Sequence, residues 1–161
     1  MKNELFDLLI ERKITVATAE SCTGGNIAAR FVAYPGISEI FLAGLVTYAN
    51  SAKEQILGVS EETLQKAGAV SIECAEEMLI GAQKATGALL TICTTGIAGP
   101  GGATKDKPVG LVYVGVRYLG TSIVEKCQFS GDREDVIRQA TDHALQMIPE
   151  LLDTLKEIIK K

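Results

Sequence analysis

Short, continuously apolar runs alternate along the chain with segments in which apolar residues recur at every third or fourth position. Runs that are rich in β-branched residues and bounded by turn-forming residues are typical of buried strands. A spacing of three or four is typical of helices that bury one face. The apolar runs predict five strands, at residues 14–18, 40–48, 88–95, 109–119 and 122–129.

The helical spacing predicts six helices, at residues 4–12, 23–33, 49–58, 60–67, 71–86 and 130–156. Ser60 and Ser71 are the expected N-caps of two of these helices, and Asn50 or Ser51 is the expected cap of the third in the chain. Pro149 is expected to kink or divide the last helix, because proline lacks the N–H group and clashes with the preceding turn.

The order of these elements predicts an α/β fold, a three-layer α/β/α sandwich around a mixed sheet. The last two strands should pair as an antiparallel hairpin around Gly120 and Thr121. The loops after the first three strands should meet on one side, where ligands bind in open α/β sheets. With 161 residues, 47% of them hydrophobic, residues 1–161 are expected to form a single domain.

Charge and patterning exclude several classes of partner. The net charge of −4 argues against a general nucleic-acid-binding surface, which needs an excess of clustered Lys and Arg. The N-terminal apolar stretch contains acidic residues, so it is neither a signal peptide nor a membrane span. The protein is therefore expected to be cytoplasmic, with no membrane partner and no nucleic-acid partner.

The cysteines and the single histidine do not follow a metal-binding pattern. Cys22, Cys74, Cys93 and Cys127 are widely spaced, with no C-x-x-C pair. His143, on the last helix, is read as a packing or surface residue rather than as a ligand or base. Free thiols are expected, with no metal and no cofactor.

The stretch T-A-E-S-C-T-G-G at residues 18–25 joins the first strand to a helix. Such a turn is expected to place backbone N–H groups at a helix N-terminus, where they attract an anion or a developing oxyanion. Ser21 lies at the mouth of that site, although a serine or threonine there could equally serve only as a helix cap. The donors would be the N–H groups of Cys22, Thr23, Gly24 and Gly25.

Two further features follow the second and third strands. Residues 96–102 hold too many glycines for an ordinary turn and are expected to contact a ligand. Lys53 lies in the first turn of a helix, where the helix dipole disfavours a cation, so it is either simply solvated or positioned for another reason.

Three stretches together, A-E-S-C-T-G-G at 19–25, V-T-Y-A-N-S-A-K at 46–53 and T-G-I-A-G-P-G-G at 95–102, resemble the CinA C-terminal domain family of nicotinamide-nucleotide amidases. K-P-V-G at 107–110 and F-S-G-D-R at 129–133 extend the resemblance over nearly the whole chain. It implies a cytosolic, homo-oligomeric hydrolase that converts the pyridine nucleotide nicotinamide mononucleotide and water to nicotinate mononucleotide and ammonia.

Within this resemblance, Ser21 matches the nucleophile of the family and Lys53 its partner base. Tyr48, Thr95 and Arg133 match positions that line the pocket. The matching motifs contribute three more candidate binding residues, Asn50, Gly96 and Gly99.

Amide hydrolysis needs an activated nucleophile, an oxyanion site and a proton for the leaving amine. A lysine whose pKa is lowered can take the serine proton. Cys22 is an alternative nucleophile, because a helix N-terminus lowers a thiol pKa, but it has no histidine near it in sequence. Glu20 either orients Thr23 or Lys53 or is a polar strand end.

The role of Arg133 is open between binding the substrate phosphate and forming a surface salt bridge with a neighbour such as Glu134.

The function of the chain is open too. The main alternative to an amidohydrolase is a non-catalytic nucleotide-binding or regulatory domain whose glycine loops hold a phosphate without chemistry. A protein-interaction domain descended from an enzyme is a third possibility.

Overall fold

A mixed five-stranded sheet forms the centre of the computed structural model, which describes residues 2–159 and the side chains of residues 4–156. Across the sheet the strand order is β2-β1-β3-β4-β5. β1 is parallel to β2 and β3, whereas β4 is antiparallel to β3 and β5. The strands are β1 Val16–Glu20, β2 Phe41–Val46, β3 Leu90–Gly96, β4 Leu111–Tyr118 and β5 Thr121–Gln128. The predicted mixed sheet and terminal hairpin are confirmed.

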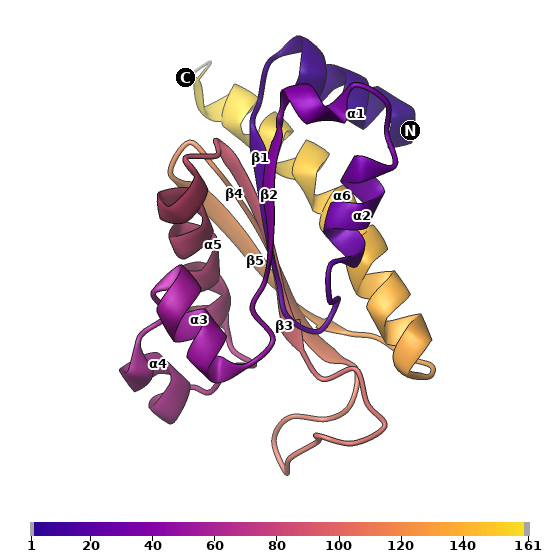
Figure 1. The fold of residues 1–161 in the computed structure, drawn as a ribbon. Helices are drawn as coiled ribbons and strands as arrows, with labels where there is room; N and C mark the ends of the chain where they lie inside the picture. Colours follow the sequence, from indigo (N-terminus) through magenta and orange to yellow (C-terminus); the bar gives the residue numbers. More distant parts are fainter. Residues whose placement is uncertain (1, 160–161) are drawn as a thin grey trace.

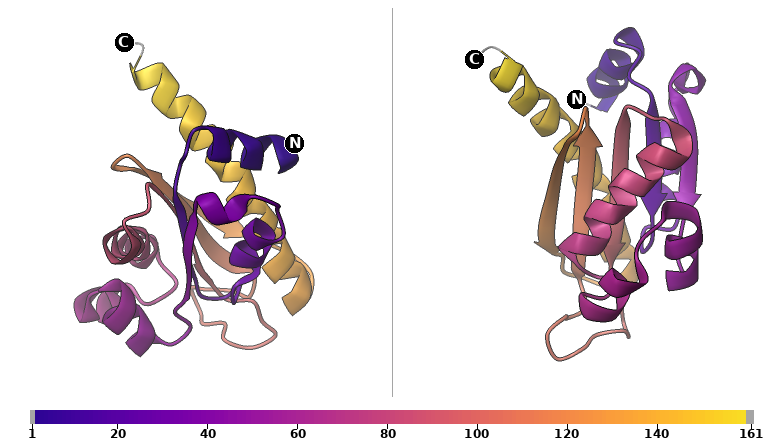
Figure 2. Two further views of the ribbon diagram at one scale, coloured as in Figure 1. Left: turned by 45° about the horizontal axis from the view of Figure 1, so that its top comes forward. Right: turned by 90° about the vertical axis from the view of Figure 1, so that its left-hand side faces the viewer.

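Helices cover both faces of the sheet, as the α/β/α prediction requires (Figure 1). One face carries α1 Lys2–Glu11, α2 Asn26–Val32 and α6 Arg133–Ile159, with the short 3₁₀ helix η1 Ile37–Glu39 beside them. The other face carries α3 Asn50–Leu57, α4 Glu61–Lys66 and α5 Ile72–Thr86 (Figure 2). None of the helices in the described part of the chain has the length and apolar character needed to cross a membrane.

The apolar core consists of two clusters separated by the sheet. Leu90 and Ile92 of β3 belong to the cluster under α6 and α2, whereas Cys93 belongs to the cluster under α5. This alternation follows from the two-residue side-chain period of a strand. Because both faces are covered, β1 and β3 are buried almost throughout, which explains the largely apolar runs that predicted them.

The carboxyl ends of β1, β2 and β3 lie together at the bottom of Figure 1, beside the long loop that connects β3 to β4. The loops after these three strands therefore lie side by side, as predicted. This edge of the sheet positions the residues described in the next subsection.

Several local predictions can be compared directly with the structure. Ser60 and Ser71 cap α4 and α5 by accepting a hydrogen bond from a backbone N–H, as predicted. The cap of α3 was predicted wrongly: it is Ala49, and no side chain caps that helix. Pro149 lies inside one continuous α6, so it does not divide the helix. α2 begins at Asn26 rather than at residue 23, because Gly24 and Gly25 adopt positive φ angles of 58° and 101°.

Candidate active site

A cavity of about 300 Å³ opens at the carboxyl ends of the parallel strands. It brings together most of the predicted site residues, which come from four separate segments of the chain. Those that line it are Ser21, Cys22, Tyr48, Asn50, Lys53, Thr95, Gly96, Gly99 and Arg133. Thr23, Gly24 and Gly25 do not line it. Ile97, Ala98, Gly101 and Gly102, from the glycine-rich segment 96–102 that was expected to contact a ligand, also line it, as do Ala69 and Val70, which were not predicted.

Ser21 and Lys53 are in direct contact in this cavity. Ser21 directly follows β1, and Lys53 comes from the first half of α3, the helix that follows β2. The Nζ atom of Lys53 lies 3.0 Å from the Oγ atom of Ser21. Ser21 is 8% exposed and Lys53 is 1% exposed. The sequence left open whether Lys53 is solvated, and the structure shows that it is buried against the serine.

The surroundings of Lys53 favour its neutral form. Burial of the amine lowers the pKa of Lys53 from its ordinary value of 10.5. Its remaining partners are two uncharged carbonyl oxygens, Thr47 O at 2.9 Å and Tyr48 O at 3.1 Å. Within the described residues no carboxylate pairs with it. A neutral amine has two N–H groups and one lone pair, so the two carbonyls can accept both hydrogens while the lone pair faces Ser21.

A buried carboxylate holds the loop that carries Ser21. Glu20, which is 0% exposed, accepts hydrogen bonds from the backbone N–H groups of Ile27 at 2.8 Å and Ala28 at 3.0 Å. It also accepts hydrogen bonds from the hydroxyls of Thr18 and Thr23. Glu20 therefore holds the start of α2 from within the core, and both of its oxygens are engaged there and with the threonine hydroxyls rather than with Lys53.

This arrangement corrects the predicted anion site. The sequence placed the N–H groups of residues 22–25 at the helix N-terminus, but α2 begins only at Asn26, and Glu20 already accepts hydrogen bonds from its first N–H groups. Thr23 is turned into the core, where its hydroxyl lies 2.7 Å from that of Thr94. Gly24 donates its N–H to Ser21 O. Of the four residues whose N–H groups were expected to bind the anion, Cys22 alone lines the cavity, beside Ser21.

The thiol of Cys22 is poorly suited to act as a nucleophile. Burial raises the pKa of Cys22 to about 11, so the thiol stays protonated near neutral pH. The expectation that a helix N-terminus would lower this pKa is wrong, because α2 starts four residues later and its donors face Glu20. Ser21, in contact with an amine, is the better-activated group.

Arg133 lies at the rim of the cavity, at the first residue of α6. Its guanidinium donates to Gly99 O at 2.7 Å and to the hydroxyl of Tyr48 at 2.9 Å. The alternative, a salt bridge with an acidic neighbour, is not formed: among the described residues Asp135 pairs with Arg138 instead. Arg133 thus links the loop after β3 to the loop after β2 and keeps free N–H groups for a ligand.

The end of β3 and the loop that follows it complete the wall of the cavity. Thr95 donates its hydroxyl to Ala69 O at 2.7 Å, which draws the segment between α4 and α5 to the cavity. A side chain at Gly96 would meet Leu111 O at 2.6 Å, so the strand pairing there requires glycine. Ala69 and Val70 were missed because they are small apolar residues with no chemical signal in the sequence.

Comparisons with known proteins agree with this architecture. A family model described as the CinA C-terminal domain matches residues 1–152. A competence-damage inducible protein of Clostridium beijerinckii is 54% identical over 145 residues, which are 90% of this chain and 35% of that protein. One from Clostridioides difficile is 46% identical over 155 residues, 96% of this chain and 37% of that protein. The chain thus spans little more than a third of the length of these relatives.

Two solved structures have the same fold. The competence/damage inducible protein CihA from Agrobacterium tumefaciens superposes with a TM-score of 0.90 at 36% identity, covering 93% of this chain and 92% of that one. The CinA superfamily protein ECK1530/EC0983 from Escherichia coli gives 0.90 at 35% identity, covering 93% of this chain and 87% of that one.

Proposed function

The chain belongs to the CinA C-terminal domain family, and on that premise we propose that it is an amidohydrolase acting through a Ser21–Lys53 pair. Its substrate would be nicotinamide mononucleotide, which it would convert with water to nicotinate mononucleotide and ammonia. The observation that carries the proposal is the 3.0 Å contact between the Ser21 hydroxyl and a lysine that is buried without a carboxylate partner.

In the first half of the proposed reaction, neutral Lys53 takes the hydroxyl proton of Ser21 while Oγ attacks the carboxamide carbon. The carbonyl oxygen becomes an oxyanion. The Cys22 N–H is the candidate donor for it, and such a donor contributes about 3 kcal/mol to the transition state. The tetrahedral intermediate then collapses: the C–N bond breaks, and the Lys53 ammonium gives its proton to the departing ammonia.

In the second half, water attacks the carbonyl carbon of the acyl-serine ester, and Lys53, neutral again, takes a proton from that water. Collapse of the second intermediate breaks the C–Oγ bond, and the proton returns from Lys53 to Ser21. The product is the carboxylate form of the nucleotide. The same lysine therefore acts as base and acid in both halves, which requires a pKa below its ordinary value.

The phosphate of the nucleotide would bind at the rim, at Arg133. A guanidinium has five N–H donors. Arg133 donates one hydrogen bond to Gly99 O and one to the Tyr48 hydroxyl, so further donors are left for a phosphate. It also begins α6, whose N-terminus favours negative charge. The family resemblance further suggests a cytoplasmic homo-oligomer.

The test is ammonia release from nicotinamide mononucleotide, nicotinamide riboside and simple amides. Wild type should release ammonia from the nucleotide, and Ser21→Ala should release none while binding it with similar affinity, since the hydroxyl does chemistry and its loss costs about 1 kcal/mol of stability at most. Nucleotide binding by wild type without ammonia release would instead indicate a non-catalytic nucleotide-binding domain. If Ser21→Ala lost both its fold and its nucleotide binding, Ser21 would be a structural residue.

A further inference from the structure

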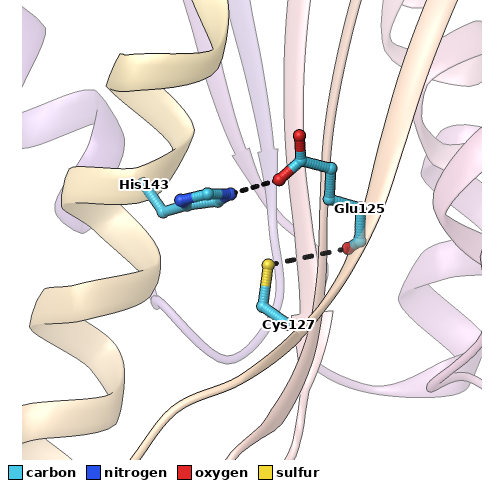
Figure 3. A group of neighbouring side chains, drawn as sticks. All are labelled: Glu125, Cys127 and His143. Atoms are coloured by element: carbon cyan, nitrogen blue, oxygen red, sulfur yellow. Dashed lines mark hydrogen bonds and ion pairs between the residues drawn. The ribbon is translucent and has the colours of Figure 1, made fainter.

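A cluster of three chemically different side chains connects β5 to α6 (Figure 3). Glu125 and Cys127 are alternate residues of β5, so both side chains leave the strand on the same side. His143 reaches them from α6. The Nε2 atom of His143 lies 2.6 Å from Glu125 Oε2. One oxygen, one sulfur and one nitrogen atom of the three residues all lie within 4.8 Å of one another.

The polar contacts inside the cluster leave the sulfur atom weakly engaged. The Sγ atom of Cys127 makes one long contact, 3.8 Å, to the backbone oxygen of Glu125. The carboxylate and imidazole face each other, with side chains 38% and 30% exposed. The three ligand atoms therefore lie close together on side chains of residues that are all partly exposed.

We propose that Glu125, Cys127 and His143 bind a divalent transition-metal ion of the zinc class, with water as the fourth ligand. A thiolate, an imidazole and a carboxylate are the three ligand types that zinc takes in proteins. Magnesium and calcium take oxygen ligands, so the sulfur and nitrogen atoms select against them. Three protein ligands leave one position open in a tetrahedral shell.

The distances are compatible with such an ion after small side-chain rotations. Zinc–ligand bonds of about 2.0–2.3 Å in a tetrahedron place the ligand atoms roughly 3.3–3.6 Å from each other. The oxygen and nitrogen atoms of Glu125 and His143 would have to separate by roughly 1 Å at most from their present 2.6 Å. The sulfur atom would have to approach by a similar amount from within 4.8 Å. Both movements need only rotation of partly exposed side chains.

The consequence of the site would be structural. β5 is an edge strand of the sheet, and an ion held by two of its residues and by His143 would fasten this edge to α6. An ion that binds only the folded chain raises its stability by mass action. None of the three residues lines the candidate active site, so the proposal stands or falls independently of the amidase proposal.

The experiment is a titration of the reduced full chain, kept reduced with a phosphine, with Zn²⁺ and separately with Co²⁺. Wild type should bind one Zn²⁺ per chain and unfold at a higher temperature with the ion. The Co²⁺ complex should show tetrahedral d–d absorption and a thiolate-to-cobalt charge-transfer band. We expect a loss of Zn²⁺ affinity of at least about tenfold in each of three variants, Cys127→Ser, His143→Gln and Glu125→Gln. Removal of a residue that only supports a metal ligand already costs about that much, so removal of a ligand itself should cost no less.

Two variants make the result specific. Glu150→Gln changes an exposed carboxylate of the same helix and should bind Zn²⁺ as wild type does. His143→Gln can still donate a hydrogen bond to Glu125, so it should fold like wild type without the ion and yet lose the gain in unfolding temperature. Absence of stoichiometric binding by wild type, a Co²⁺ complex without a thiolate band, or undiminished binding by the His143 variant would each overturn the proposal.

Discussion

Replacement of Lys53 by arginine distinguishes two possible roles of this residue, a general base and a permanent positive charge. The Lys53 amine contacts Ser21 Oγ and two backbone carbonyls, and the residue is only 1% exposed. An arginine retains the positive charge and has more donors for the same acceptors. It cannot become neutral, because its pKa is above about 12. Lys53→Arg should therefore bind nicotinamide mononucleotide and release almost no ammonia.

The expected loss follows from the role of the proton transfer. A positioned general base contributes about 10²–10⁴-fold to the rate, or about 3–5 kcal/mol of activation free energy. With a pKa above about 12, fewer than roughly one guanidinium in 10⁵ is neutral at pH 7. The larger side chain also overpacks the site, at a cost of about 1–3 kcal/mol in folding stability. We thus expect kcat to fall by at least about 100-fold while the fold persists.

The assay is ammonia release under saturating substrate, with nucleotide affinity measured separately by calorimetry. Lys53→Met is the matched control, because it has similar volume and no charge, and it should be folded and inactive. The wild-type rate should rise with pH through a pKa below 10.5, since burial lowers the pKa of Lys53 and its neutral form is the active one. Turnover of Lys53→Arg within about tenfold of wild type would refute the Ser–Lys mechanism.

Three further predictions concern Arg133, Glu20 and the buried amine of Lys53. Arg133→Ala should raise KM for the nucleotide about 10–100-fold, the effect of losing a charged hydrogen bond, and leave KM for the riboside nearly unchanged; equal losses on both substrates would contradict a phosphate role. Glu20→Gln should lower stability by about 1–3 kcal/mol and also lower kcat, because the new amide group faces donors at the start of α2. Thermal unfolding and ammonia release check this, with Glu54→Gln, an exposed carboxylate change, as the unaffected control. The free energy of unfolding of wild type relative to Lys53→Met should rise with pH between the lowered pKa of Lys53 and 10.5, because the unfolded chain binds the lysine proton more strongly than the folded chain in that range. Denaturant unfolding of both proteins at several pH values measures this difference in stability. A difference that falls as the pH rises would contradict a lowered pKa.

The fold could be predicted from the sequence because its signals are local. Continuous apolar runs mark strands that are covered on both faces, and Ser60 and Ser71 mark the starts of their helices by the bonds that serine makes there. The start of α2 could not be predicted in this way. Its first N–H groups are satisfied by Glu20, which lies seven residues before Ile27 and reaches it because the turn at Gly24 and Gly25 folds the chain back.

The candidate site was predictable where it depends on unusual chemistry and not where it depends on packing. Ser21, Lys53 and Arg133 could be singled out by resemblance and by position, but their contacts depend on tertiary structure. Lys53 in a first turn is compatible with solvent, and only the packing of α3 under the loop after β2 shows that it is buried. Ala69 and Val70 carry no such signal and are placed by one hydrogen bond from Thr95.

The charges around Ser21 are arranged so that the lysine can lose its proton. A carboxylate beside Lys53 would hold it as an ammonium, yet the buried Glu20 directs both oxygens to the start of α2 and to two threonine hydroxyls. The thiols of Cys22 and Cys74 would also raise the pKa of Lys53 if they ionised. Burial raises the pKa of each to about 11, above the ordinary value for lysine, so both stay neutral where Lys53 titrates. Glu20 is thus satisfied elsewhere and the two thiols are kept uncharged, and burial is left as the dominant influence on the pKa of Lys53.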